Sequence, residues 1–299
     1  MEQNKTMREK IRQCCATECT ELIIEGVSSP KVLEEIEQCG GHLRRLSIQN
    51  SPKLTQFKAD DDFFKDFPFG INLFNMTHFE LKDTGISELP SNFGEKWISL
   101  TDVRLYKNKI ETFPDEFGKK WTELKILEIS EEPLIEIPKG FGNTWTQLRT
   151  FSLKNTPLET LPDDFGETWT QLKKVILIQN DITELSDFFG ETWTQLEAIN
   201  LYQNQITELP YNFGDEWSHL REITIYEPKL NFKDLIYQED QEELLKMRWP
   251  NASGSIHAGH YYRSLQFRPD VEKEKIDLDD RERERLGIYQ SPGFLFRSY

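Results

Sequence analysis

Large apolar residues recur along the chain with a period of about 24 residues. Phe-Gly pairs occur at 69–70, 93–94, 117–118, 141–142, 165–166, 189–190 and 213–214, and a large apolar residue stands four positions after each phenylalanine. That position holds Leu73, Trp97, Trp121, Trp145, Trp169, Trp193 and Trp217. Six of the seven tryptophans therefore represent one structural position, which indicates a repeat protein.

A second pattern lies inside each repeat. The stretch 196–217 reads LEAINLYQNQITELPYNFGDEW, in which a single polar residue separates Ile199 from Leu201. Such alternation predicts a short β-strand with one buried face. Because one strand cannot bury that face alone, we expect the repeats to stack with their strands side by side. The Leu-Pro-x-x-Phe-Gly-x-x-Trp segment then returns along the outer side, where the tryptophans are predicted to form a buried seam.

The motif L-x-x-L-x-L-x-x-N-x-I-x-x-L-P resembles the leucine-rich repeat family, whose period is about 20–29 residues. The resemblance covers residues 19–235 and implies an α/β-type solenoid of about eight to nine repeats. The implied shape is a curved horseshoe with a parallel concave β-sheet and an irregular or short-helical convex side. The Leu-Pro and Gly of the return segment are similar to those of the intracellular branch of this family.

The resemblance also implies an asparagine at each strand exit, where its side chain normally bonds to the backbone of a neighbouring turn. Only Asn108, Asn180 and Asn204 supply this residue. The other exit positions hold Ser51, Thr84, Glu132, Thr156 and Pro228. We therefore expect the ladder of asparagine side chains to be interrupted.

Both ends of the repeat array are expected to carry caps. Residues 1–18 are predicted to be an N-terminal helical cap, and SSPKVLEEIEQCGG is predicted to be a helix with Ser29 as its N-cap. Residues 236–268 are predicted to be a C-terminal cap, with a helix in DQEELLKMRWP capped by Asp240 and a strand in SIHAGHYYRSLQF. Residues 269–299 form a charged, aromatic-ended tail, which either folds back over the last repeat or docks on a partner.

The net charge, the apolar runs and the cysteines indicate which kinds of partner and which cellular compartment to expect. The net charge of −16 argues against nucleic acid or an anionic membrane as the main partner, since both require clustered positive charge. The longest aliphatic run, at 175–178, is too short for a membrane span, and residues 1–13 lack the apolar centre of a secretory signal. We therefore expect a cytoplasmic protein, monomeric on its own, in which Cys14, Cys15, Cys19 and Cys39 are reduced; a disulfide-linked cap is the alternative.

The sequence offers no strong candidate for catalysis, a metal or a cofactor. The adjacent Asp60, Asp61 and Asp62 splay apart, and Gly259 disfavours a helix that would pair His257 with His260. There is no Gly-rich phosphate loop, no G-x-S-x-G motif and no cysteine after Cys39. We therefore predict a protein that is not an enzyme and has no cofactor, no metal and no small-molecule substrate. An enzyme built on the segment that follows the repeats is the weakest alternative, because that segment is short for a domain.

The residues between the buried strand positions are predicted to face the concave side. Folding requires no apolar residue there, yet isoleucines and tyrosines occur among charged residues, as in protein interfaces. We predict a binding site for a protein partner formed by Arg104, Tyr106, Ile126, Glu128, Lys154, Ile176, Ile178, Tyr202 and Tyr226. The predicted function is non-catalytic protein binding; the alternative is a bacterial-type effector of the same fold, delivered into a host cell by a non-classical secretion system to act on host proteins.

Overall fold

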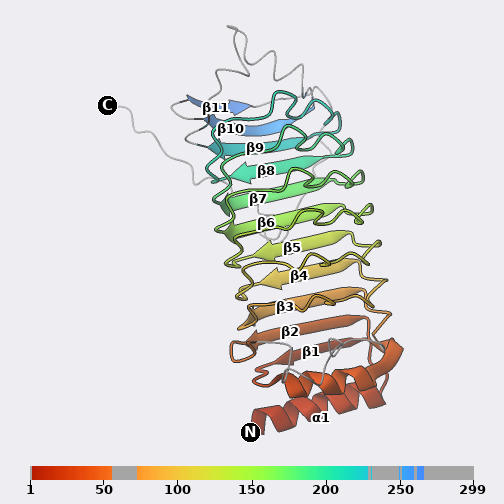
Figure 1. The fold of residues 1–299 in the computed structure, drawn as a ribbon. Coiled ribbons are helices and arrows are strands. Elements are labelled where there is room, and N and C mark those ends of the chain that lie inside the picture. Colours follow the sequence, from red (N-terminus) through yellow and green to blue (C-terminus); the bar gives the residue numbers. More distant parts are fainter. Residues whose placement is uncertain are drawn as a thin grey trace. The chain divides into compact units, whose positions relative to one another are not determined.

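A computed structural model describes residues 2–55, 73–227, 230, 249, 251–258 and 261–265 of the 299-residue chain. These residues form a solenoid in which one eleven-stranded sheet follows the chain order (Figure 1). The strands are β1 Glu21–Glu25, β2 Arg45–Ser51, β3 His78–Thr84, β4 Asp102–Tyr106, β5 Ile126–Ser130, β6 Thr150–Thr156, β7 Lys174–Asn180, β8 Ala198–Tyr202, β9 Glu222–Glu227, β10 Ser253–Ala258 and β11 Tyr261–Leu265. Neighbours from β1 to β10 pair in parallel, and β11 pairs antiparallel with β10.

The register of the sheet places buried residues beside buried residues. Val103 of β4 lies opposite Leu127 of β5, and Leu127 lies opposite Phe151 of β6. All three side chains are fully buried, whereas the alternate positions of β4 and β5 are half-buried. The alternation in the sequence therefore correctly predicts the strands and the face that each one buries.

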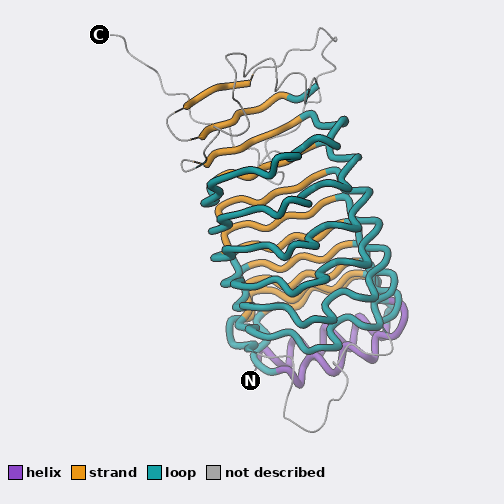
Figure 2. The backbone as a smooth tube through the Cα atoms, turned by 45° about the horizontal axis from the view of Figure 1, so that its top comes forward, coloured by secondary structure: helices purple, strands orange, loops and turns teal. Residues whose placement is uncertain are grey.

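The return segments lie on the opposite side of the solenoid from the strands (Figure 2). In the described part of the chain after His42 they consist of turns and bends, with no helical turn. The convex side is thus irregular, one of the two forms that the sequence predicts. The turns of each return segment are closed by local hydrogen bonds between residues three apart, such as Trp169 N–H to Gly166 O at 3.0 Å.

The tryptophans form a continuous buried spine along the return segments. Adjacent indoles from Trp121 to Trp217 lie 6.1–6.4 Å apart between ring centroids, with their planes 9–16° apart. Each indole N–H donates to a glycine carbonyl 27 residues earlier, as in Trp145 to Gly118 at 2.8 Å. The predicted seam is confirmed, and the hydrogen bond explains why one residue type is repeated: an indole combines a large apolar surface with one donor.

From Gly94 to Gly214, the glycine of each Phe-Gly pair is required by both its backbone and its surroundings. Gly142 has φ +73°, a region that other residues rarely adopt. A β-carbon on Gly142 would lie 2.5 Å from Trp145 Cε3 and 2.9 Å from Trp169 Cζ2. The glycine therefore allows the backbone to approach two indoles at once.

The seventh tryptophan, Trp249, extends the spine by one more turn. Its indole stacks on Trp217 at 6.3 Å and donates to Gly214 O at 2.9 Å, although it follows Trp217 at a longer interval than the regular period. The chain then continues into β10, which pairs in parallel with β9. Parallel pairing thus continues past residue 235, where the sequence pattern places the last repeat, and the strand predicted within SIHAGHYYRSLQF is present as the end of β10 and as β11.

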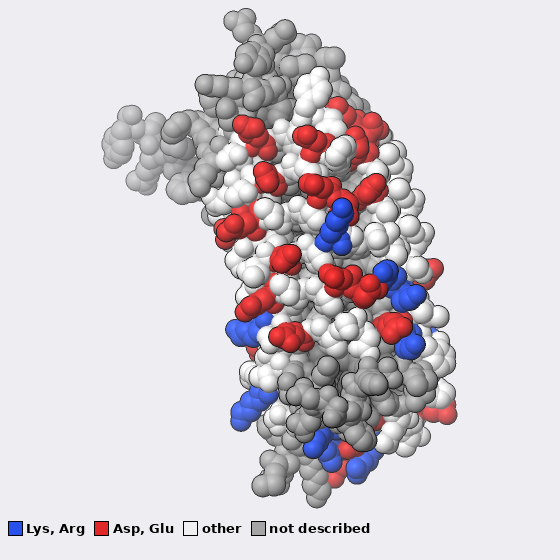
Figure 3. All heavy atoms as spheres, in the orientation of Figure 1, with Lys and Arg blue, Asp and Glu red and all other residues white. Residues whose placement is uncertain are grey.

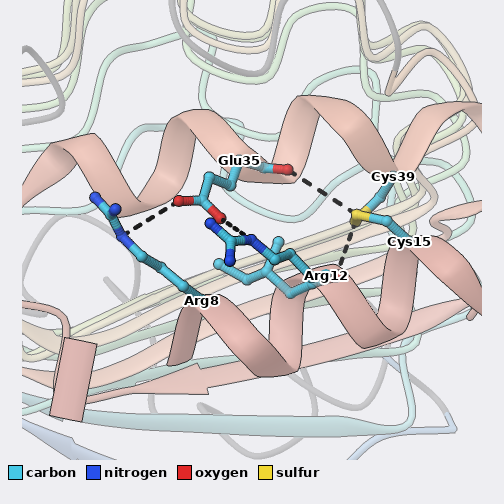
Figure 4. A network of polar contacts seen from close by, with 6 residues as sticks. Arg8, Arg12, Cys15, Glu35 and Cys39 are labelled. Atoms are coloured by element: carbon cyan, nitrogen blue, oxygen red, sulfur yellow. Dashed lines mark hydrogen bonds and ion pairs between the residues drawn. A yellow bond between two sulfur atoms is a disulfide. The ribbon is translucent and has the colours of Figure 1, made fainter. Parts of the chain in front are cut away.

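Two helical segments flank β1 in the sequence, and the two pack against each other. The predicted N-terminal helix is α1, Glu2–Ala16, and it buries Met7 and Ile11 against the core. The second segment, η1, Pro30–His42, is a 3₁₀ helix, and Ser29 makes no side-chain capping bond there. Glu35 of η1 lies between Arg8 and Arg12 of α1, with Nε–Oε distances of 3.2 Å to each (Figure 4).

The four cysteines are paired, so the expectation of reduced thiols is wrong for this structure. Cys14 bonds to Cys19, and Cys15 bonds to Cys39 (Figure 4 shows the second pair). Neighbouring cysteines at the end of α1 therefore attach this helix both to the residues before β1 and to η1. Spacing along the chain did not reveal these pairs because the 3₁₀ helix brings Cys39 back beside α1.

Buried polar side chains at the strand exits replace the missing asparagines. Thr84 Oγ1 donates to Asn108 Oδ1 at 2.7 Å, and Asn108 Nδ2 donates to Glu132 Oε1 at 2.7 Å. Glu132 Oε2 accepts a further bond from Ile110 N–H at 3.2 Å. The predicted interruption is therefore wrong at Thr84 and Glu132, because a hydroxyl and a carboxylate make bonds that link the same turns.

Several predicted features lie outside the described residues. They are the acidic loop with Asp60, Asp61 and Asp62, the exit position Pro228, the closing helix that begins at Asp240, and the tail 269–299. Among the described residues, no helix has the length and apolar character needed to cross a bilayer.

Candidate protein-binding face

The inner face of the sheet consists of the alternate, outward-pointing positions of β1–β9. Strand pairing sets these positions side by side, so that Arg104 lies opposite Glu128 and Lys154 lies opposite Ile178. The face carries all nine residues predicted to bind a partner: Arg104, Tyr106, Ile126, Glu128, Lys154, Ile176, Ile178, Tyr202 and Tyr226.

The first half of the inner face is occupied by side chains that pair across neighbouring strands. The Tyr106 hydroxyl donates to Glu128 Oε2, and Arg104 Nε lies 3.7 Å from the same oxygen. Burial, followed by the Glu128 charge, raises the pKa of the Tyr106 hydroxyl far above its ordinary value, so this group keeps its proton. Three predicted residues are thus held together as one polar cluster.

Two further cross-strand pairs precede this cluster. Ser47 Oγ donates to Glu80 Oε1 at 2.7 Å, and His78 Nε2 lies 3.4 Å from Asp102 Oδ2. Burial lowers the pKa of His78, although the Asp102 charge opposes this effect. The polar groups from β2 to β5 therefore satisfy one another to a large extent.

Ile176 and Ile178 are buried, contrary to the expectation that they would be exposed. Ile176 is 3% exposed and Ile178 is 5% exposed, and Ser152, opposite Ile176 on β6, is 4% exposed. Neighbouring strands are only about 4.8 Å apart, so side chains on the flanking strands shield these positions from water. These two isoleucines form the floor of the face rather than part of its contact surface.

Two lysines flank this floor. Lys174 begins β7, and Lys154 lies opposite Ile178 near the end of β6. Burial lowers the pKa of both lysines. The Glu128 charge opposes this effect at Lys154, and the Glu222 charge of β9 is the main charge that opposes it at Lys174. Sequence analysis included Lys154 in the site and left out Lys174, whose only signal was its register beside Thr150 and Ala198.

Beyond the lysines lies an aromatic pair. The rings of Tyr202 and Tyr226 are 5.1 Å apart between centroids and 37° apart in plane, on adjacent strands. Pairing between β7 and β8 ends at Ile176 and Asn200, and Asn200 Oδ1 then accepts the backbone N–H of Tyr202 at 3.0 Å. Asn200 therefore positions Tyr202, a role that the sequence pattern did not indicate.

Ile126 has a different place from the other predicted residues. It begins β5, between Asp102 and Thr150 in register, and is half-buried. It lies at the entrance edge of the strands, outside both the Glu128 cluster and the tyrosine pair.

The described residues contain no group of three His, Cys, Asp or Glu side chains that could hold a metal ion. His257 lies in β10, a strand as expected. Two grooves lie among the Phe-Gly turns of the return segments, with Lys139 lining both. Acidic side chains outnumber basic ones on the surface shown in Figure 3, consistent with the net charge of −16.

No protein-family model matches the chain, and no curated protein does so either. Solved structures do match it. A chain of the glycosylated Drosophila Toll–Spatzle complex is 19% identical over 80% of this chain and 33% of its own length, with a TM-score of 0.62. A leucine-rich repeat protein of Leptospira interrogans is 15% identical over 82% of this chain and 69% of its own, with a TM-score of 0.52. TLR13 in complex with ssRNA13 is 17% identical over 74% of this chain and 35% of its own, with a TM-score of 0.52.

These likenesses, the parallel sheet and the regular 24-residue period from β3 to β9 define the class: the chain has the leucine-rich repeat fold. The chain spans about a third of the length of the Toll and TLR13 chains that it matches. The identities are low, so the likeness extends to the fold and not to a particular ligand.

Proposed function

We propose that this protein is a non-catalytic binding module that holds a protein partner on the inner face of the sheet. The observation that carries the proposal is the Tyr202–Tyr226 pair, which the fold does not need for its core. Tyrosine offers a large, rigid contact area with a polar end, and it is enriched at the centres of protein interfaces. The half-buried charged residues around the pair supply the polar surroundings that such interfaces have.

The test compares two tyrosine substitutions on the inner face with one on the outer side. The double variant Tyr202→Ala, Tyr226→Ala is expected to lose the partners that the tagged full-length chain retains from its native lysate. Tyr211→Ala is the matched control, because Tyr211 lies in the neighbouring return segment and is 90% exposed. If the control and the double variant retain the same partners, the inner face is not the binding site. Ile176→Asp is unsuitable here, because it would place a charge in the buried floor.

RNA is the second partner class that the fold neighbours raise, since one of them is a complex with ssRNA13. The net charge of −16 disfavours it for this chain, because phosphate contacts require clustered Lys and Arg. We expect single-stranded RNA not to compete with a protein partner at physiological ionic strength. Competition that weakens steeply with added salt would favour RNA instead.

The location of the protein is a separate proposal. The cytoplasm is the expectation from the sequence, whereas the two cysteine pairs favour an oxidising compartment. Fractionation of the source cells, with the thiols blocked before lysis, separates these cases. Oxidised protein outside the cytoplasm would favour the effector alternative, and reduced protein in the cytoplasm would favour a cytoplasmic binding module.

A further inference from the structure

A groove lies between two successive return segments, on the outer side of the solenoid and away from the strands (Figure 2). Its volume is about 510 Å³, and residues 162–167 of one turn and 188–192 of the next form most of its lining. The apolar part of the lining consists of Pro162, Phe165 and Phe188. Phe165 is buried in the core, whereas Phe188 is 64% exposed.

The core does not account for Phe188. The equivalent position holds Asp164 in the preceding turn and Asn212 in the following turn. Ser186, which replaces the proline of the other turns, accepts the Phe188 N–H at 3.3 Å through its hydroxyl oxygen and donates to Asp163 O at 3.2 Å. Phe188 is thus held beside the preceding turn with its ring largely open to solvent.

The charges around Phe188 are predominantly negative. The lining carboxylates are those of Asp163, Asp164, Glu167 and Glu191, and among the described residues the one cation of the lining is Lys139. None of these five belongs to an ion pair with a described residue. Two carboxylates accept hydrogen bonds from neutral donors, Asp164 from Gly140 N–H at 3.0 Å and Glu191 from Asn212 Nδ2 at 3.4 Å, and these bonds leave their charge uncompensated.

The turns that follow supply no further cation. From residue 175 to residue 220 the sequence has eight acidic residues and no lysine or arginine. The groove one turn earlier is different, because its charged lining residues are two carboxylates and two lysines: Asp115, Glu116, Lys119 and Lys139. Lys119 Nζ lies 2.9 Å from Glu116 Oε1 there, and Gly140 takes the position of Phe188. An exposed ring beside uncompensated carboxylates therefore distinguishes the groove at Phe188 from the groove before it.

We infer that the groove at Phe188 is a second docking surface, which binds an arginine-containing basic segment of a partner protein, with one guanidinium stacked on Phe188 and paired with the carboxylate of Asp163 or Glu191. The inference goes beyond the proposed function, because this surface lies on the opposite side of the solenoid from the inner face. A guanidinium is planar, so it can stack on an aromatic ring and donate to a carboxylate at the same time. No group of three acidic, His or Cys side chains among the described residues is placed to hold a metal ion, so the spread carboxylates suit an extended cationic segment better than a single ion.

The test first selects a probe on the immobilised full-length chain from a phage-displayed library of random twelve-residue peptides. The triple variant Asp163→Asn, Phe188→Ala, Glu191→Gln is present in excess in solution during selection, so that it removes the peptides that bind elsewhere. The peptides that remain are expected to be enriched in arginine. The affinity of one fluorescein-labelled peptide is then measured by anisotropy. Replacement of its arginine by lysine is expected to weaken binding at least threefold, because an ammonium group lacks the planar shape that both stacks and pairs.

Two aromatic substitutions compare the groove with its surroundings. Phe188→Ala is expected to weaken the selected peptide at least fivefold through the loss of the stacked ring. Tyr211→Ala is the matched control, because Tyr211 is 90% exposed and does not line the groove. It is expected to change the affinity less than twofold.

Two pairs of charge substitutions separate the groove from the overall acidity of the chain. Asp163→Asn with Glu191→Gln is expected to weaken the peptide at least tenfold. Asp181→Asn with Glu208→Gln is the matched control, because it removes the same two charges from exposed positions outside the lining. It is expected to change the affinity less than twofold. Far-UV circular dichroism and tryptophan fluorescence verify that each variant is folded.

The outcomes are independent of those that test the proposed function. The inference is overturned if no peptide survives the selection, or if the surviving peptides show no preference for arginine. Equal effects of the two carboxylate pairs overturn it as well, because overall charge would then explain the binding. The Tyr202→Ala, Tyr226→Ala variant is expected to bind the peptide with wild-type affinity. Loss of binding there would place the peptide on the inner face, which contradicts this inference and supports the proposed function.

Discussion

The indole N–H of Trp169 donates to the carbonyl of Gly142 at 2.9 Å, across 27 residues of chain. The same bond recurs at every spine tryptophan from Trp121 to Trp249. Each repeat is thereby fastened to the one before it through both stacking and a buried hydrogen bond. Stability is expected to depend on such nearest-neighbour contacts, as in other solenoids.

Alanine substitutions at Gly140 and Gly142, two glycines of one turn, should distinguish the cost of steric crowding from the cost of backbone strain. Gly140 and Gly142 have φ values of +77° and +73°, yet a β-carbon on Gly140 would meet only Asn143 Nδ2, at 3.5 Å. We expect Gly140→Ala to lower the free energy of unfolding by about 1–2 kcal/mol through its backbone alone. Gly142→Ala is expected to cost about 1–3 kcal/mol more, because the methyl group overlaps two indoles. Urea unfolding measures the free energy of unfolding of both variants. Equal losses would contradict the close contact between Gly142 and the two indoles.

Replacing the last spine tryptophan should loosen only the end of the array. Trp249→Ala removes a fully enclosed indole that stacks on Trp217, so a local loss of about 3–5 kcal/mol is expected. Amide hydrogen exchange should accelerate in β9 and β10 and stay unchanged in β4 and β5, because repeats contact only their neighbours. Unchanged exchange in β9 would show that Trp249 is not part of the spine.

Glu132 should make stability depend on pH. Burial raises the pKa of its carboxyl from 4.5 to about 7, against hydrogen bonds from Asn108 and Ile110 that lower it. The folded protein therefore binds this proton more tightly than the unfolded chain does. The tighter proton binding of Glu132 stabilises the folded state fully below about pH 4.5, and this stabilisation is lost as the pH rises to about 7. The change in the free energy of unfolding over this range is up to about 3 kcal/mol.

The matched variant for this effect is Glu132→Asn, which restores the asparagine that the repeat motif has at this position. The stability of Glu132→Asn relative to the wild type should rise between pH 4.5 and 7 and then level off. Urea unfolding of both proteins at several pH values gives this difference in the free energy of unfolding. The contributions of the other titrating groups are common to both proteins and cancel in the difference. A difference that stays constant across this range would mean that Glu132 titrates alike in the folded and unfolded states.

Reduction should loosen the N-terminal cap. The Cys15–Cys39 bond closes a loop of 24 residues, and a cross-link of that size is worth about 3 kcal/mol. A thiol reductant is expected to speed hydrogen exchange in α1 while the spine repeats keep their protection. Intact mass after alkylation without reductant provides the control: four alkylated cysteines in native protein would contradict the pairing.

The central repeats could be read from the sequence because each strand and each turn repeats locally. Ile199 and Leu201 flank a single polar residue, so their alternation already specifies the buried face. The tryptophan seam was equally accessible, since the spine tryptophans from Trp97 to Trp217 are evenly spaced along the chain. The concave position of Tyr202 and Tyr226 followed from the same register.

The sequence alone therefore determined the period, the parallel sheet, the buried face and the residues available on the inner face, because all of these depend on spacing within one repeat. Only the tertiary structure decided the pairing of Cys15 with Cys39, the place of Trp249 in the spine and the burial of Ile176 and Ile178. The cysteine pair and Trp249 lie where the regular period is interrupted, so their partners depend on the path of the chain in space. The burial of Ile176 and Ile178 depends on the side chains that surround them on neighbouring strands. Spacing along the chain does not indicate which of these residues come into contact.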